Sequence, residues 1–336
     1  MAEGGVFPYR PPRPATDDLI RWPASFGTRF IVWVDVEEEF DWSAPLDRRH
    51  SAVTAMRAMP DAHARFAERG VGLACMVDHP VASDPAAVDI LRAVVADGRS
   101  SIGAQLHAWV NPPYVGAQAG DSYPGNLAPA LEAAKLDVLT DLLHDAFGRR
   151  PLAYRAGRYG IGPATAALLA NRGYRIDASI RSRYDYSGDL GPDFSAIGGD
   201  AYRIGSLIEV PLTTVFTGRL RHAGAMLYPL LGRLPHGRGA FARSGLLQRI
   251  ALTPEDMPIE DAVEAVRIAV GEGRQRLLSL SFHSPSLQAG HTPYVRDADD
   301  LARFWTWWDR MLDLLDRLSV MPIGVDDLIE QADIRP

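Results

Sequence analysis

The sequence Phe30-Ile31-Val32-Trp33-Val34-Asp35-Val36 is the first long apolar run of the chain, and Glu37-Glu38-Glu39 follows it directly. An apolar, β-branched run of this kind is typical of a strand that is buried on both faces, as in a parallel sheet. Side chains alternate along a strand, so Asp35 and Glu37 are expected on one face, with Glu39 joining them if the strand continues. Crowded carboxylates repel one another, and a divalent cation or a bound proton relieves that repulsion.

Similar apolar runs recur along the chain, with helical patterns between them, which is the pattern of a parallel sheet with crossover helices. The predicted strands are 30–36, 72–77, 101–106, 152–154, 175–179, 206–211, 277–282 and 321–325. The clearest predicted helices are 84–96, 127–147, 163–172 and 297–318. We therefore expect an α/β fold in which one barrel forms a single domain.

Two segments do not fit this alternation. Residues 1–28 are rich in Pro, Gly and Arg, and we expect an extended N-terminal arm without a core of its own. Residues 213–258 are rich in Arg, Gly and Leu, and we expect an insertion that covers one end of the barrel. The barrel itself is predicted to comprise residues 29–336.

The composition excludes several kinds of chemistry. The 336 residues carry a formal net charge of −7, and the arginines are interspersed with acids, which argues against a nucleic-acid partner. Lys135 is the only lysine of the chain and lies in a helical pattern that we expect on the surface. A P-loop and a pyridoxal Schiff base each need a lysine in a different setting, so neither is expected.

Cys75 is the only cysteine, so an internal disulfide and a four-cysteine zinc site are excluded. We expect Cys75 in the core and the protein in the cytoplasm. No apolar stretch reaches the roughly 18 residues of a membrane span, and the start of the chain lacks a signal-peptide pattern. The oligomeric state stays open.

Polar residues follow several other predicted strands, at the end where barrel enzymes carry their chemistry. These residues are Gln105 and His107, Trp109, Arg155 and Tyr159, Asp177, and His283. Each has a plainer interpretation: a structural histidine, a structural ion pair, a solvated acidic turn at 37–39, or core packing for Trp109 and the aromatic stretch 304–308. Asp78-His79 is either a further ligand pair or a turn, and we favour the turn. Because so many strand ends contribute polar groups, we predict a shared site.

The order of these motifs resembles the polysaccharide deacetylases of the NodB-homology type, carbohydrate esterase family four, over roughly residues 29–325. That family has a distorted (β/α) barrel of seven or eight strands and five short motifs. Their counterparts here are Val34-Asp35-Val36-Glu37, Gln105-Leu106-His107, Arg155-Ala156-Gly157, Asp177-Ala178-Ser179 and Leu280-Ser281-Phe282-His283. Val36 stands where the family has a metal-binding aspartate and Gln105 where a metal histidine is expected, so the resemblance is to a divergent branch.

The resemblance implies roles for these residues. Glu37, His107 and Asp35 would hold a divalent metal, with zinc expected and cobalt, nickel or manganese as alternatives. Asp35 would act as general base and His283 as general acid. Arg155 would pair with Asp35, and Asp177 would orient His283 or hold Arg155. Trp109 and Tyr159 would contact the substrate, with Gln105 as a third ligand or a further substrate contact.

The function that we expect is a metal-dependent hydrolase that removes an N- or O-acetyl group from an amino sugar or polysaccharide. One alternative is an amidohydrolase for a small non-sugar amide such as a ureide. Another is a metal-free barrel that binds a glycan or a protein without turnover. A serine nucleophile is not expected, because no Gly-x-Ser-x-Gly elbow occurs in the chain.

Overall fold

One curled sheet carries the fold of the computed structural model, which describes residues 8–116, 120–273 and 275–334. The strand order is β10-β1-β2-β3-β4-β5-β7-β6. The short strand β11 lies off this path and pairs with the first two residues of β1, Arg29 and Phe30. Neighbouring strands are parallel except β6, which is antiparallel to β7. The bounds are β1 (Arg29–Val36), β2 (Leu73–Val77), β3 (Ser101–Leu106), β4 (Ala153–Ala156), β5 (Ile176–Asp177), β6 (Tyr202–Ile204), β7 (Leu207–Glu209), β10 (Leu277–His283) and β11 (Met321–Pro322).

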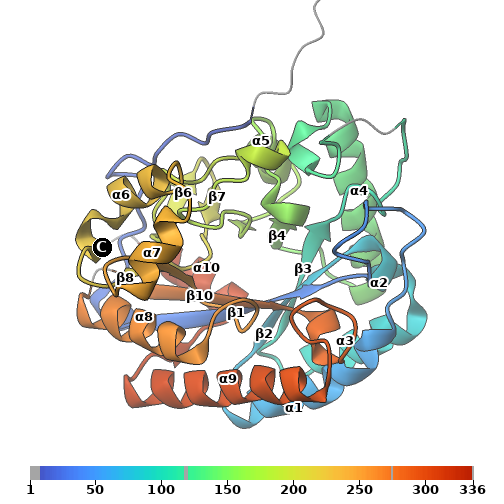
Figure 1. Cartoon of the computed structure of the whole chain (residues 1–336). Helices are drawn as coiled ribbons and strands as arrows, with labels where there is room; N and C mark the ends of the chain where they lie inside the picture. The colour runs from blue at the N-terminus through green and yellow to red at the C-terminus, as the bar shows by residue number, and fades with distance from the viewer. Residues whose placement is uncertain (1–7, 117–119, 274, 335–336) are drawn as a thin grey trace, which may run out of the picture.

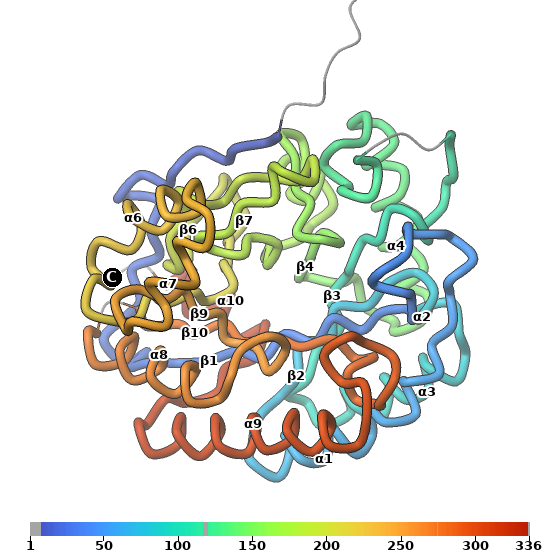
Figure 2. The backbone as a smooth tube through the Cα atoms, viewed as in Figure 1, coloured from blue at the N-terminus to red at the C-terminus, as the bar shows by residue number. Residues whose placement is uncertain are grey.

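Helices surround this sheet on its outer side, and Figures 1 and 2 show the chain curling from β1 through β3 and β4 to β7 inside them. Their bounds are α1 (Met59–Glu68), α2 (His79–Ser83), α3 (Pro85–Val95), α4 (Pro129–Phe147), α5 (Thr165–Ala170), α8 (Ile259–Gly271), α9 (Ala298–Arg317) and α10 (Val325–Asp333). The expected α/β fold, a distorted (β/α) barrel in a single domain, is confirmed.

The segment 213–258 contains a short antiparallel hairpin that encloses two helices. Strand β8 (Thr214–Thr217) pairs with β9 (Gln248–Ala251), and α6 (Gly224–Leu231) and α7 (Gly237–Arg243) lie between them in sequence. Figure 1 shows α6 and α7 at the left edge of the barrel. Neither this hairpin nor β6 was predicted, because each strand is only three or four residues long.

Two apolar cores lie on opposite sides of β1, and this alternation positions the site. Phe30, Val32 and Val34 pack in the outer core against the helices. Ile31 and Trp33 pack in the inner core of the barrel. The next side chains on the inner side are therefore Asp35 and Glu37, at the carboxyl end of the strand.

The described part of the N-terminal arm lies along the barrel. Leu19 forms an isolated antiparallel bridge with Tyr202 of β6. Trp22 stacks on Phe26 with ring centroids 4.1 Å apart, and the Phe26 side chain is buried in the inner core. Residues 1–7, the first part of the predicted arm, lie outside the described residues.

Lys135 is buried, and its expected position on the surface was wrong. Its Nζ donates to the backbone carbonyl of Ala108 at 2.9 Å and also to that of Asn111. Burial lowers the pKa of Lys135 to about 8. The helical pattern showed that Lys135 lies on α4, but it could not show that the loop after β3 covers that face.

Other expectations about the core are met. Cys75 is buried in β2, and Phe304, Trp307 and Trp308 of α9 are buried in the outer core. No helix among the described residues has the length and apolar character needed to cross a bilayer.

Asp97 provides a test of how the loop before β3 is held. Its side chain accepts hydrogen bonds from the backbone N–H groups of Arg99 (2.8 Å) and Ser100 (2.7 Å) and lies 2.9 Å from Nε2 of His63. Burial alone would raise the pKa of Asp97, but the donations from His63, Ser100 and Arg99 outweigh it and lower the pKa to about 2. The charged Asp97 carboxylate therefore stabilises the folded state at any pH above the ordinary pKa of an aspartate.

We expect Asp97→Asn to lower the free energy of unfolding by on the order of 1 kcal/mol at pH 7, a value discounted for solvent screening. Because the folded pKa is depressed, the difference from wild type should shrink as the pH falls from about 4 towards about 2. Urea denaturation across this range measures it, with Asp89→Asn as an exposed control. A difference that is independent of pH would contradict the assignment.

Candidate active site

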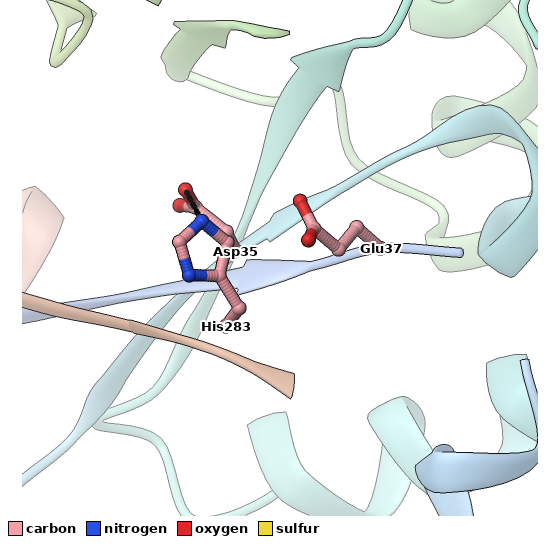
Figure 3. Close-up of side chains that lie close together, drawn as sticks. All are labelled: Asp35, Glu37 and His283. Atoms are coloured by element: carbon pink, nitrogen blue, oxygen red, sulfur yellow. Dashed lines mark ion pairs between the residues drawn. The ribbon is translucent and has the colours of Figure 1, made fainter. Parts of the chain in front are cut away.

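Asp35, Glu37 and His283 converge at the carboxyl ends of β1 and β10, as Figure 3 shows. The two strands are parallel, and Asp35 stands opposite His283 in their register. Nε2 of His283 lies 3.5 Å from Oδ2 of Asp35. The other carboxylate oxygen, Oδ1, accepts from Nη1 of Arg155, whose Nε donates to the Ala178 carbonyl at 3.0 Å. The Asp35 carboxylate therefore lies between a guanidinium and an imidazole.

His283 is held from its other side by Glu255. Nδ1 of His283 lies 2.6 Å from Oε2 of Glu255, and the backbone N–H of His283 donates to Oε1 at 3.1 Å. The Ser286 hydroxyl also donates to Oε1, at 2.5 Å. Burial alone would lower the pKa of His283, but the carboxylates of Glu255, Glu37 and Asp35 together raise it to about 10. His283 is thus an imidazolium at neutral pH.

A second buried cluster lies beside the first and contains His107, Glu38 and Asp78. Nδ1 of His107 lies 2.7 Å from Oε2 of Glu38. Asp78 accepts from the Glu38 backbone N–H at 2.8 Å and caps α2 by accepting from the Val81 N–H at 2.9 Å. Burial raises the pKa of both carboxyls. Asp78 thus caps the start of α2 with one hydrogen bond and holds the backbone of Glu38 with the other. Glu38 in turn contacts His107.

Glu37 joins the two clusters. Its Oε2 lies 3.5 Å from Nε2 of His107 and accepts from Nε2 of Gln105 at 3.3 Å. Burial, the largest cause, raises the pKa of Glu37 to about 8, although His283 and His107 act in the opposite direction. Oε1 of Glu37 and Oε1 of Gln105 are buried and have no hydrogen-bond partner among the described residues.

These features fit a divalent cation. A metal-binding histidine usually binds the ion with one ring nitrogen and donates a hydrogen bond from the other to a carboxylate. In His107, Nδ1 lies at the Glu38 carboxylate, and Nε2 faces Glu37. A cation would neutralise the Glu37 carboxylate and would give a partner to its Oε1, which accepts no hydrogen bond from any described residue. The side chains close enough to share one ion are Asp35, Glu37 and His283, whereas His107 groups with Glu38 and Asp78, so the predicted ligands Glu37, His107 and Asp35 come from both groups. Either way the donors are carboxylates and an imidazole, a set that suits zinc and its neighbours in the first transition row.

A cavity of about 1000 Å³ opens over these residues. Trp42 contacts the His283 ring edge to face at 5.2 Å, and Trp109 stacks on the His107 ring at 4.3 Å. Phe40 stacks on Trp42 at 5.0 Å and meets Trp109 edge to face at 5.9 Å. Three aromatic side chains therefore cover the two histidines on the side of the cavity.

Strained backbone shapes another wall of the cavity. A Cβ at Gly157 would lie 2.5 Å from Cδ2 of His107, so this position accepts only glycine. The following residues, Arg158 and Tyr159, have φ values of 56° and 59°, which are unfavourable for residues with a side chain. Arg158 pairs with Asp189, and Tyr159 stacks on Tyr186 at 5.7 Å. These contacts hold the strained turn and place Tyr159 in the cavity wall.

The structure brings most of the predicted site residues together. Those that line the cavity are Asp35, Glu37, Gln105, His107, Trp109, Tyr159 and His283. Arg155 lies directly behind Asp35. Asp177 does not line the cavity: its Oδ1 accepts from the Ser179 N–H at 3.0 Å and from the Ser179 hydroxyl.

The position of Asp177 follows from strand alternation. Ile176 and Ala178 point into the inner core, so Asp177 between them points outwards, beside Glu209. Burial raises the pKa of Asp177 to about 6. We therefore assign the orientation of His283 to Glu255 instead of Asp177.

Comparisons with known proteins support the fold. No family model matches the chain, and no curated protein matches it. Among solved structures, a Mycobacterium smegmatis protein named as a polysaccharide deacetylase aligns with a TM-score of 0.51 and 16% identity, over 95% of this chain and 97% of that one. The PuuE allantoinase aligns with a TM-score of 0.50 and 15% identity, over 93% and 92%. A GH57 branching enzyme from Thermococcus kodakaraensis aligns with a TM-score of 0.52 and 12% identity, over 92% and 72%.

The chain shares the fold of all three. Their names describe three different activities, so the fold alone does not decide the chemistry of this chain. The side chains of the site must decide it.

Sequence reasoning missed several residues of the site. Glu38 was noted only as part of an acidic run, and Lys135 was placed on the surface. Glu255 follows the apolar end of β9, Ile250-Ala251-Leu252, by three residues. The rule that selected His283, a polar residue after an apolar run, would have selected Glu255 if the insertion had been divided into strands.

The contact between Glu255 and His283 leads to a prediction about charge. In chelator-treated protein, Glu255→Gln should lower the pKa of His283 from about 10 towards its ordinary value, because a neutral amide no longer stabilises the imidazolium. NMR titration of the imidazole resonances measures the shift, and Glu260→Gln on exposed α8 is the matched control. An unchanged titration would show that Asp35 and Glu37 alone set the charge of His283.

Proposed function

We propose that this protein is a metal-dependent hydrolase that removes an acyl group, N- or O-acetyl, from an amino sugar or polysaccharide. The observation that carries the proposal is the pair of opposed groups at one cavity: the Asp35 carboxylate backed by Arg155, and the His283 imidazolium backed by Glu255. Hydrolysis of an amide or ester needs a base for the attacking water and an acid for the leaving group.

Asp35 is the proposed base. The Arg155 guanidinium stabilises its carboxylate form, and the hydrogen bond from Arg155 to the Ala178 carbonyl fixes the guanidinium in place. The other oxygen, Oδ2, accepts no hydrogen bond from Arg155 and lies 3.5 Å from Nε2 of His283, so it is the oxygen that would take a proton from a water molecule in the cavity. Asp35 would therefore collect the proton as the water attacks the acyl carbon.

His283 is the proposed acid. The neighbouring carboxylates, Glu255 first among them, favour its protonated form, and it lines the cavity while Nδ1 stays bound to Glu255. The proton on Nε2 can pass to the departing amine or alcohol as the acyl bond breaks. Asp35 then holds the proton lost by the water, so a second proton transfer restores both residues.

A divalent ion held by Glu37, His107 and Asp35 would supply Lewis acidity, lowering the pKa of a water and polarising the acyl carbonyl. Zinc is the expected ion, with cobalt, nickel or manganese as alternatives. Gln105 lies beside Glu37 and serves as a further ligand or a substrate contact.

The cavity favours a sugar over a small amide. Its volume of about 1000 Å³ is at the upper end of the range for ligand pockets. Trp109 and Tyr159 line it and offer aromatic faces of the kind that pack against sugar rings. A small ureide, the substrate class suggested by the likeness to an allantoinase, would leave most of this space unfilled.

The cytoplasmic location that we infer rests on the single buried Cys75.

Asp35→Asn should reduce turnover by roughly 10²- to 10⁴-fold, because an amide cannot accept the proton. The variant should still fold, with a lower free energy of unfolding because the buried Arg155 loses its charged partner. Circular dichroism and elemental mass spectrometry of the same preparation separate loss of the base from loss of the fold or of the metal. Acetate release from N-acetylglucosamine oligomers and from acetylated sugars measures the rate, and Asp41→Asn in the neighbouring loop is the control. Substantial residual activity in Asp35→Asn would rule out Asp35 as the base.

His107→Ala should strip the metal from the protein. We expect about one equivalent of ion per wild-type chain after exposure to zinc, cobalt, nickel or manganese, measured by elemental mass spectrometry on untagged protein. His63→Ala changes a histidine outside the cavity and should keep the full equivalent. Unchanged metal content in His107→Ala would place the ion elsewhere, and no binding by wild type would favour a metal-free binding barrel.

A further inference from the structure

The insertion has an unusual charge. Residues 213–258 contain six arginines and two acids, Glu255 and Asp256 near the end of the segment, although the whole chain carries a net charge of −7. Arg221 pairs with Glu272 at 3.0 Å. Arg219, Arg233 and Arg243 are exposed and form no ion pair with any described residue. The insertion is therefore a positive surface on an acidic protein.

The same segment exposes large aliphatic side chains. Met226 is 65% exposed, Leu234 59%, Leu230 47% and Leu220 38%. Met226 and Leu230 are one helical turn apart on α6 and share a face. Exposed aliphatic side chains that gather in one segment mark an interaction surface. Here they occur in the same segment as arginines that form no ion pair with any described residue.

The insertion is attached firmly to the wall of the catalytic cavity. Arg249 of β9 lies between the rings of Tyr184, at 3.4 Å, and Tyr228 of α6, at 4.8 Å. The cavity residue Arg181 lies over Tyr184 at 4.0 Å, and Arg238 of α7 lies over Tyr228 at 4.6 Å. This series of cation–π contacts leads from the cavity wall to α6 and α7.

We propose that the insertion docks this protein on an anionic phospholipid surface. Arg219, Arg233 and Arg243 would contact lipid phosphates, while Met226, Leu230 and Leu234 would enter the boundary between headgroups and acyl chains. A nucleic acid or an acidic polysaccharide would satisfy the arginines but leave the aliphatic side chains in water. The combination of both residue types favours a lipid surface, and the inference does not depend on the proposed reaction.

The test is sedimentation of the full chain with vesicles. We expect binding to vesicles of equimolar phosphatidylcholine and phosphatidylglycerol, weakened by salt, and little binding to phosphatidylcholine alone. The triple variant Arg219→Gln, Arg233→Gln, Arg243→Gln should bind on the order of 100-fold more weakly, roughly fivefold for each arginine. The control variant Arg57→Gln, Arg99→Gln, Arg317→Gln has the same net charge and should bind like wild type.

A second variant, Met226→Ser, Leu230→Ser, Leu234→Ser, separates a lipid surface from other anionic partners. It should lose about tenfold or more in vesicle binding but keep wild-type retention on heparin, and its circular dichroism spectrum checks that it is folded. Wild-type vesicle binding by this variant would overturn the proposal in favour of a polyanion surface. Equal losses in the two arginine variants, or no binding of wild type to anionic vesicles, would overturn it as well.

Discussion

The buried contact between Arg155 and Asp35 is the interaction on which the site depends. Arg155 is 0% and Asp35 3% exposed, so both charges have given up most of their hydration. Such a pair persists only where further hydrogen bonds satisfy its remaining groups. Nε of Arg155 is bound to Ala178, whereas Nη2 is buried without a partner among the described residues. One nitrogen of the Arg155 guanidinium is thus left without a hydrogen bond. An ion pair with such an unsatisfied group contributes little to the stability of the fold.

The register between β1 and β10 places this pair beside His283. Trp33 donates from its indole nitrogen to the Ser279 hydroxyl at 2.8 Å, which ties the two strands together below the site. A slip of one residue in β1 would move Asp35 and Glu37 into the outer apolar core and bring Val34 and Val36 into the cavity. The register of β1 therefore sets both which apolar side chains enter each core and which reactive groups face the cavity.

That constraint explains what the sequence could and could not predict. Strand alternation and the position of polar residues after apolar runs were enough to place Asp35, Glu37, Gln105 and His107. The same rule selected Asp177, which lies beside Glu209 and does not line the cavity, and its other expected role, holding Arg155, stays a prediction. Glu255 gave no periodic signal, since it is fixed by a contact with His283, 28 residues further along the chain. The apolar run before Glu255 marks it as a residue at a strand end, but it does not show that its partner is His283.

The insertion therefore has two connections to the site. Glu255 follows β9 and holds His283, while Arg249 within β9 stacks between a tyrosine of the cavity side and a tyrosine of α6. Both contacts belong to one short stretch of chain, so β9 cannot shift without changing the support of His283. A surface bound by α6 and α7 would act on the same strand. One short stretch of chain, from Arg249 to Glu255, therefore contacts both α6 and the proposed acid, and the insertion is part of the active-site scaffold.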